Sequence, residues 1–246
     1  MLLIAIDTSG RNGSVALCRG DRDNFETLQL IPLQGGTYSA RLMPSIANLI
    51  DGQGFSKEQV DAFVIVTGPG SFTGLRVGIS TVKGLCEVLQ KPLVAVSMLE
   101  AVAVVRGPEA LKGHGFSRAE SVSSNAASAA EERLTVALDA GRGEVYAGDF
   151  ELSNSRAALI REHIVKLDTF AANAASDQVR VLTPDNKVAE VLLGTGVAAQ
   201  LVDPVHADEI GGIGLSKLLR GEVADPAMLD ANYIRRSDAE IFSPKR

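Results

Sequence analysis

Residues 62–89 read AFVIVTGPGSFTGLRVGISTVKGLCEVL, and this stretch decides the fold. Residues 63–66 are apolar and mostly β-branched, which predicts a short buried strand. A glycine loop follows, and from Ser71 onward apolar residues recur at steps of three and four, which predicts a helix. A strand, a glycine loop and a helix in this order indicate an α/β protein.

The glycine loop meets no standard nucleotide-binding motif. Ser71 and Thr73 can cap the helix, whose first amides and positive dipole end would attract an anion. A Walker A loop needs lysine and then serine or threonine directly after its last glycine, but Gly74 is followed by leucine and arginine. The spacing of Gly68, Gly70 and Gly74 also misses the dinucleotide-binding pattern by one residue.

The predicted helix contains glycines, which weaken it. Gly74 and Gly78 each cost about 1 kcal/mol relative to alanine. A helix that carries this cost usually lets another backbone come close. Two interpretations stay open: the neighbour is the protein's own sheet, or it is a helix of another subunit.

The composition of the 246-residue chain limits its partners and its compartment. Hydrophobic residues make up 46% and charged residues 22%, so a sizeable core can be buried. The net charge of -6 argues against broad phosphate binding, which needs a basic face. The two cysteines, Cys18 and Cys86, are expected to be buried thiols in a reducing compartment. No apolar run is long enough for a membrane span or signal peptide, so we expect a cytoplasmic protein.

The chain begins with an apolar run, residues 2–6, that ends in Asp7. A buried strand that delivers a carboxylate into a tight turn also begins sugar kinases, actin and Hsp70. In those proteins a glycine two residues after the aspartate lets the backbone approach a phosphate. This chain has Ser9 at that place. We therefore predict a vestigial nucleotide site made of Asp7, Thr8, Ser9, Gly68, Gly70 and Ser71.

The order of the remaining elements predicts an actin-like ATPase (ASKHA) fold with two tandem domains. Strands at 13–18, 25–30 and 93–96 and a helix at 37–49, which Ser39 can cap, complete a first domain at residues 1–98. Residues 99–133 are expected to be a helix, at 99–105, and a flexible insertion rich in glycine, serine and alanine.

The second domain, residues 134–246, is expected to be a reduced copy of the first. A strand at 134–138 runs into Asp139 and a glycine turn, so the opening of the first domain appears again. Further strands are predicted at 179–182 and 191–193, and a helix at 208–219.

Several motifs together resemble the TsaB (YeaZ) family. They are LLIAIDTS, YSARLMPSI, VTGPGSFTGLRVGISTVKGL, LDAGRGEVYAG and NYIRRSDAEI, in this order over almost the whole chain. The resemblance implies a non-catalytic subunit required for N6-threonylcarbamoyladenosine in tRNAs that read codons beginning with A. Such a subunit binds and activates TsaD, the ATPase TsaE joins the pair, and TsaC supplies the activated threonylcarbamoyl group. In the absence of TsaD, pairing of two copies through the same helices is expected, and tRNA is contacted mainly through the complex.

The resemblance also implies where the partner binds. The expected interface lies on the helices of the first domain, at Leu42, Met43, Ile46, Thr73, Gly74, Leu75, Arg76, Gly78, Ile79 and Val82. No catalytic residue, cofactor or metal is expected, because His114, His163 and His206 lack the HxxxH spacing of TsaD.

Two other functions remain as alternatives. A residual ATPase or a peptidase would use Asp7 and Asp139 as carboxylates and residues 68–73 as an anion site. A direct tRNA-binding protein would use the basic residues of the tail, which are Arg235, Arg236, Lys245 and Arg246.

Overall fold

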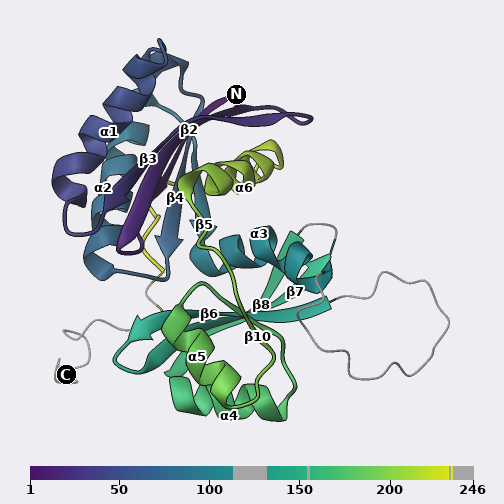
Figure 1. Ribbon diagram of the computed structural model, residues 1–246. Helices are drawn as coiled ribbons and strands as arrows, with labels where there is room; N and C mark the ends of the chain where they lie inside the picture. Colours follow the sequence, from purple (N-terminus) through teal and green to yellow (C-terminus); the bar gives the residue numbers. More distant parts are fainter. Residues whose placement is uncertain (113–131, 154–155, 233, 235–246) are drawn as a thin grey trace. The chain divides into compact units, whose positions relative to one another are not determined.

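The computed structural model describes residues 1–112, 132–153, 156–232 and 234 (Figure 1). These residues divide into two units. The first unit comprises Met1–Ala101 together with the described chain from Val205 onward, and the second comprises the described part of residues 102–204. Each unit is built on one five-stranded sheet.

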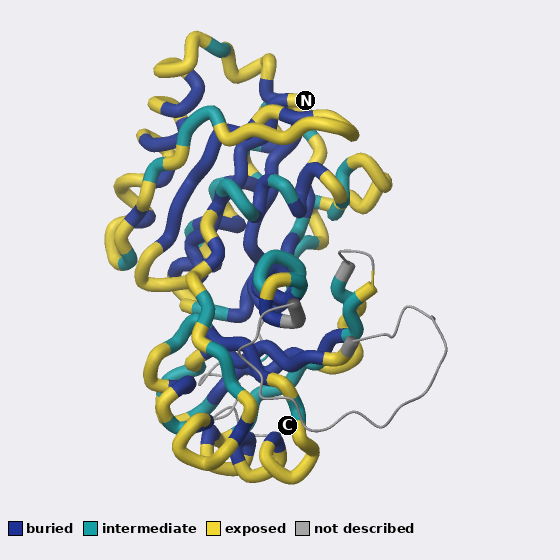
Figure 2. Tube along the Cα trace, turned by 45° about the vertical axis from the view of Figure 1, so that its right-hand side comes forward, coloured by how far each residue is buried: buried dark blue, intermediate teal, exposed yellow. Residues whose placement is uncertain are grey.

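The first sheet has the strand order β3-β2-β1-β4-β5. Strands β1, β2 and β3 form an antiparallel meander, while β4 and β5 run parallel to β1. Figure 2 shows the central strands buried, and β1 and β4 are buried along their whole length. The strands are β1 (Leu2–Asp7), β2 (Asn12–Gly20), β3 (Phe25–Gln34), β4 (Ala62–Gly68) and β5 (Leu93–Ser97). Asp7 thus lies at the carboxyl edge of the parallel strands, where open α/β sheets bind ligands.

Helices cover both faces of this sheet (Figure 1). On one face, apolar side chains such as Ile4, Phe63 and Ile65 form a core with the inner stripes of two helices. A short 3-10 helix, η1 (Lys57–Gln59), precedes β4. The helices are α1 (Tyr38–Gly52) and α2 (Phe72–Leu89) on this face and α6 (Ala207–Leu219) on the other.

The position of α6 differs from the expected grouping, which assigned residues 208–219 to the second domain. In the structure α6 packs on the first sheet, because its glycines let the helix approach the strands closely. A Cβ atom on Gly214 would clash with Val64, and one on Gly211 would lie 2.8 Å from Sγ of Cys18. The Ala207 amide also donates to Oγ of Ser14 at 2.9 Å.

The second unit repeats the plan of the first on a smaller scale. Its sheet has the order β10-β9-β6-β7-β8, with β6, β7 and β8 antiparallel and β9 and β10 parallel to β6. Two helices and their apolar stripes cover one face. The elements are β6 (Glu132–Gly141), β7 (Glu144–Ser153), β8 (Arg156–Lys166), α4 (Leu167–Ser176), β9 (Val181–Thr183), α5 (Asn186–Gly194) and β10 (Ala199–Leu201). Two sheets with this shared topology form the actin-like ATPase fold.

Three local predictions were wrong. Residues 191–193 belong to α5 rather than to a strand, because Val188, Ala189 and Leu192 bury one helical face. Helix α3 (Met98–Lys112) extends through residues 106–112, which were expected to belong to the insertion. Helix α1 begins at Tyr38, so Ser39 lies inside it and does not cap it. Residues 113–131 of the predicted insertion lie outside the described residues.

Candidate functional site

The turn after β1 donates hydrogen bonds to the carboxylate of Asp7, the last residue of that strand. Asp7 is only 3% exposed, and its Oδ1 accepts hydrogen bonds from the Ser9 amide at 2.8 Å and the Ser9 hydroxyl at 2.6 Å. Burial raises the pKa of the Asp7 carboxyl above its ordinary value, although the two hydrogen bonds from Ser9 oppose the shift. The serine that replaces the expected glycine therefore serves as the partner of Asp7.

The start of α2 is joined to the same turn. The Ser71 amide donates to the Ser9 carbonyl oxygen at 2.6 Å, and Oγ of Ser71 caps the helix by accepting from the Gly74 amide at 3.3 Å. A Cβ atom on Gly70 would clash with the backbone of Ser9. The structure thus brings together Asp7, Thr8, Ser9, Gly70 and Ser71 of the predicted site, whereas Gly68 faces Leu75 and Asn232. The Ser9 carbonyl takes the Ser71 amide that a phosphate could otherwise use.

The buried Asp7 carboxyl predicts a dependence of stability on pH. Because its pKa is raised in the fold, the folded protein binds this proton more tightly than the unfolded chain does. The stabilising contribution is complete below the ordinary carboxyl pKa of about 4 and is lost as pH rises through the raised value. We expect Asp7→Asn to melt at a higher temperature than the wild type at pH 7, with a difference that shrinks toward pH 4. Thermal unfolding of both proteins between pH 4 and pH 7 tests this prediction. A difference in melting temperature that grows on acidification would contradict a raised pKa for Asp7.

The glycines of α2 fall into two groups. A Cβ atom on Gly74 would clash with the carbonyl oxygen of Thr8, and one on Gly78 would clash with Oγ1 of the same residue. Oγ1 of Thr8 also donates to the Gly74 carbonyl oxygen at 2.8 Å. At these two positions the close neighbour is therefore the turn after β1 of the same chain. A Cβ atom on Gly84, in contrast, would meet nothing within 4 Å.

Most of the predicted interface residues face the interior of the first unit. Among them only Met43, Thr73 and Arg76 are exposed, and the Arg76 guanidinium lies 3.9 Å from the centre of the Phe72 ring. The apolar stripe that the sequence analysis assigned to a partner is the stripe that packs on the sheet, as is usual for an amphipathic helix. The buried residues are Leu42, Ile46, Gly74, Leu75, Gly78, Ile79 and Val82.

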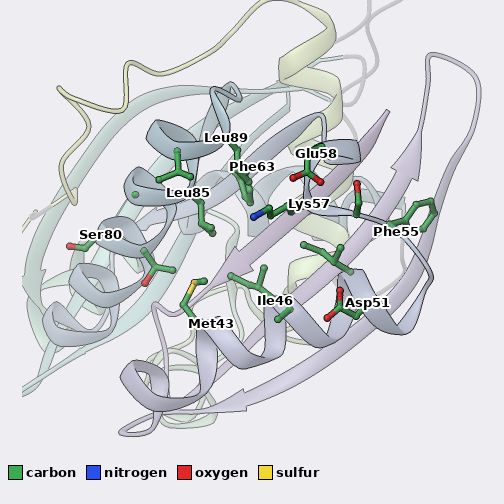
Figure 3. Close-up of a pocket in the computed structure, with 16 residues that line it drawn as sticks. Met43, Ile46, Asp51, Phe55, Lys57, Glu58, Phe63, Ser80, Leu85 and Leu89 are labelled. Carbon is green, nitrogen blue, oxygen red and sulfur yellow. The ribbon is translucent and has the colours of Figure 1, made fainter.

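An apolar groove of about 900 Å³ lies between α1 and α2. Figure 3 shows Met43 and Ile46 of α1 on one side and Ser80, Leu85 and Leu89 of α2 on the other. Ala47, Gly84 and Val88 also line the groove, with Lys57 and Glu58 at one end. Val88 is 77% exposed and Met43 47% exposed, so the groove presents two large apolar side chains to water.

Gly84 and Val88 were not among the residues expected at the interface. A signal was available for Val88, because this apolar residue falls outside the helical stripe formed by Ile79, Val82 and Cys86. Gly84 carries the same signal, because it lies four residues before Val88 and therefore on the same face of the helix.

The described residues contain no group of three or more histidine, cysteine, aspartate or glutamate side chains that could hold a metal ion. His163 lies on β8 and His206 precedes α6, while His114 and the basic residues of the tail lie outside the described ranges. Asp139 accepts a hydrogen bond from the Gly141 amide at 2.8 Å, within its own turn. In the described part of the chain no helix has the length and apolar character that crossing a membrane requires.

Comparison with known proteins gives matches over nearly the whole chain. The TsaB protein of Bacillus subtilis is 28% identical over 98% of this chain and 96% of its own length. The solved structure of YeaZ from Pseudomonas aeruginosa is 27% identical and superposes with a TM-score of 0.67 over 92% of this chain and 96% of that one. Over nearly its whole length this chain is similar to proteins of the TsaB (YeaZ) family.

Shorter matches are found to TsaD and to a further TsaB protein. The family model described as TsaD, tRNA N6-adenosine threonylcarbamoyltransferase, matches residues 34–112, which include α1, α2 and the strands beside them. The TsaB protein of Escherichia coli is 30% identical over 61% of this chain and 55% of its own length. The part of this chain that is similar to TsaD thus includes the helices that line the groove.

Proposed function

We propose that this chain is a non-catalytic subunit in the formation of N6-threonylcarbamoyladenosine in tRNAs that read codons beginning with A. The names of the TsaB relatives support a place in this biosynthesis. The closed Asp7 turn carries the non-catalytic part of the proposal. Asp7 is buried and held by Ser9, and the Ser71 amide at the start of α2 is bound to the Ser9 carbonyl oxygen.

The proposed role is to bind and activate TsaD, with TsaE joining the pair and TsaC supplying the activated group. We place the TsaD contact on the exposed side of α1 and α2, at the groove lined by Met43, Ala47, Gly84 and Val88. Small residues let a partner helix come close, and exposed apolar side chains gain from being buried. The buried stripes of the two helices pack on the first sheet, opposite this surface.

The same surface would serve self-pairing when TsaD is absent. Two copies that cover this groove would each bury Val88 and Met43, whose exposure is costly in water. The proposed compartment is the cytoplasm, where tRNA is modified, and tRNA contact would come mainly through the complex. The net charge of -6 supports this proposal, because an acidic chain by itself attracts the tRNA phosphates poorly.

Reconstitution tests the proposal. Purified TsaC, TsaD and TsaE with tRNA, threonine, bicarbonate and ATP are expected to form the modified nucleoside only when this chain is added. The chain alone is expected to bind no ATP-magnesium by calorimetry, because its own backbone uses the anion site. Micromolar ATP binding or ATP turnover by the isolated chain would favour the residual ATPase instead, and modification at full rate without the chain would overturn the proposal.

A further inference from the structure

The Asp7 turn contacts both helices that line the groove, and Tyr38 makes the contact to α1. Tyr38 is the first residue of α1 and is 4% exposed. Its hydroxyl donates to the carbonyl oxygen of Gly10 at 2.7 Å. Burial, and then the negative charge of Asp7, raise the pKa of Tyr38 to about 12, so the phenol keeps the proton it donates.

The ring of Tyr38 is wedged between the turn and α2. A Cβ atom on Gly13 would lie 2.6 Å from the Tyr38 hydroxyl oxygen, and one on Gly74 would lie 3.3 Å from the ring edge. A larger residue at Gly13 would displace the ring, and one at Gly74 would press on its edge. The start of α1 is therefore held against both β2 and α2.

Thr8 makes the corresponding contact to α2. Its side chain is fully buried and donates to the Gly74 carbonyl oxygen at 2.8 Å. The same side chain fills the space beside Gly78, one turn further along the helix. Thr8 thus determines both how close α2 comes to the sheet and where along its axis it lies.

We propose that Thr8 and Tyr38 are positioning residues that set the spacing of α1 and α2 and thereby the shape of the groove between them. The inference rests on the proposed function, because this spacing matters for activity only if the groove receives TsaD. Closely packed interiors transmit such displacements along rigid helices. The turn that holds phosphate in nucleotide-binding relatives of this fold would act here as a spacer under the partner surface.

Conservative substitutions test the proposal. Thr8→Val keeps the shape of the side chain but removes its hydrogen bond to α2. The matched control is Thr67→Val, because the buried Thr67 hydroxyl donates to the Val96 carbonyl oxygen at 3.4 Å and joins two strands rather than a strand and a helix. At a temperature where both variants are folded, we expect Thr8→Val to weaken TsaD binding roughly fivefold. Thr67→Val is expected to leave TsaD binding unchanged even if it melts earlier.

A rescue experiment distinguishes positioning from general destabilisation. Gly78→Ala places a methyl group against Oγ1 of Thr8 and should displace α2, with a loss of roughly tenfold in TsaD affinity. Adding Thr8→Ala makes room for that methyl group, so the double variant is expected to bind TsaD more tightly than Gly78→Ala alone.

Failure of the spacing inference and failure of the proposed function give different binding results. If wild-type chain binds TsaD and Val88→Asp does not, but Thr8→Val binds like the wild type, the spacing inference is overturned and the proposed function stands. If Thr67→Val weakens binding as much as Thr8→Val, the effect is one of stability and the inference is again overturned. If the wild-type chain shows no affinity for TsaD, the proposed function fails and this inference fails with it.

Discussion

Alanine at Gly74 is expected to lower the free energy of unfolding by about 3 kcal/mol, whereas alanine at Gly84 in the same helix is expected to raise it by about 1 kcal/mol. The new methyl group at Gly74 would clash with the carbonyl oxygen of Thr8, which is backbone in a buried turn and cannot move aside. At Gly84 the methyl group points into open space, so only the higher helix propensity of alanine remains.

Urea unfolding followed by circular dichroism measures both changes. The comparison needs no estimate of absolute stability, because the two variants differ by the same atoms in the same helix and are expected to shift in opposite directions. Equal shifts would contradict the close packing of α2 on the Asp7 turn. A stable Gly74→Ala variant would reopen the interpretation in which this glycine serves a partner.

Aspartate at Val88 is expected to weaken binding to TsaD by roughly a hundredfold or more without loss of stability. Val88 is 77% exposed, so the folded chain accepts a charge there. In the proposed complex the same charge would be buried in an apolar groove without a partner, which costs several kcal/mol at the interface. Titration of TsaD with the variant, by calorimetry or interferometry, gives the affinity.

Val223→Asp provides the control for this experiment. Val223 is also a large exposed apolar residue, at 54%, but it follows α6 and does not line the groove. The Val223→Asp variant carries the same added charge on the same unit, and we expect it to bind TsaD like the wild type. Equal losses in the two variants would show that net charge and not the groove controls binding, and unchanged binding by Val88→Asp would remove the groove from the proposal.

Much of the fold could be predicted, because helix caps and apolar periodicity depend on residues that are close in the sequence. Ser71 caps α2 as expected, and the apolar stripe through Leu75 and Ile79 faces the core with helical periodicity. The aspartate at the end of β1 and the serine two residues later indicated an altered turn. The short segment 191–193 was assigned wrongly, since a run of three apolar residues is compatible with either a strand or a helix.

The candidate site was predicted less well. The apolar stripe on α1 and α2 was assigned to a partner, although the sheet already covers it. Gly74 and Gly84 are identical residues in one helix, and their different surroundings depend on Thr8, which lies far away in the sequence. The helical spacing places Gly84 on the side opposite the buried stripe, but it does not reveal that Thr8 contacts Gly74.

The sequence by itself determined the secondary structure of the first domain, the duplicated opening with Asp7 and Asp139, and the replacement of a phosphate-loop glycine by Ser9. These features depend on neighbouring residues and on side-chain periodicity, which a sequence displays directly. Only the tertiary structure decided that Ser9 closes the turn, that α6 packs on the first sheet, and which side of α2 remains open. Those outcomes depend on contacts between residues remote in the chain, where a difference of about one methyl group decides whether two backbones can meet.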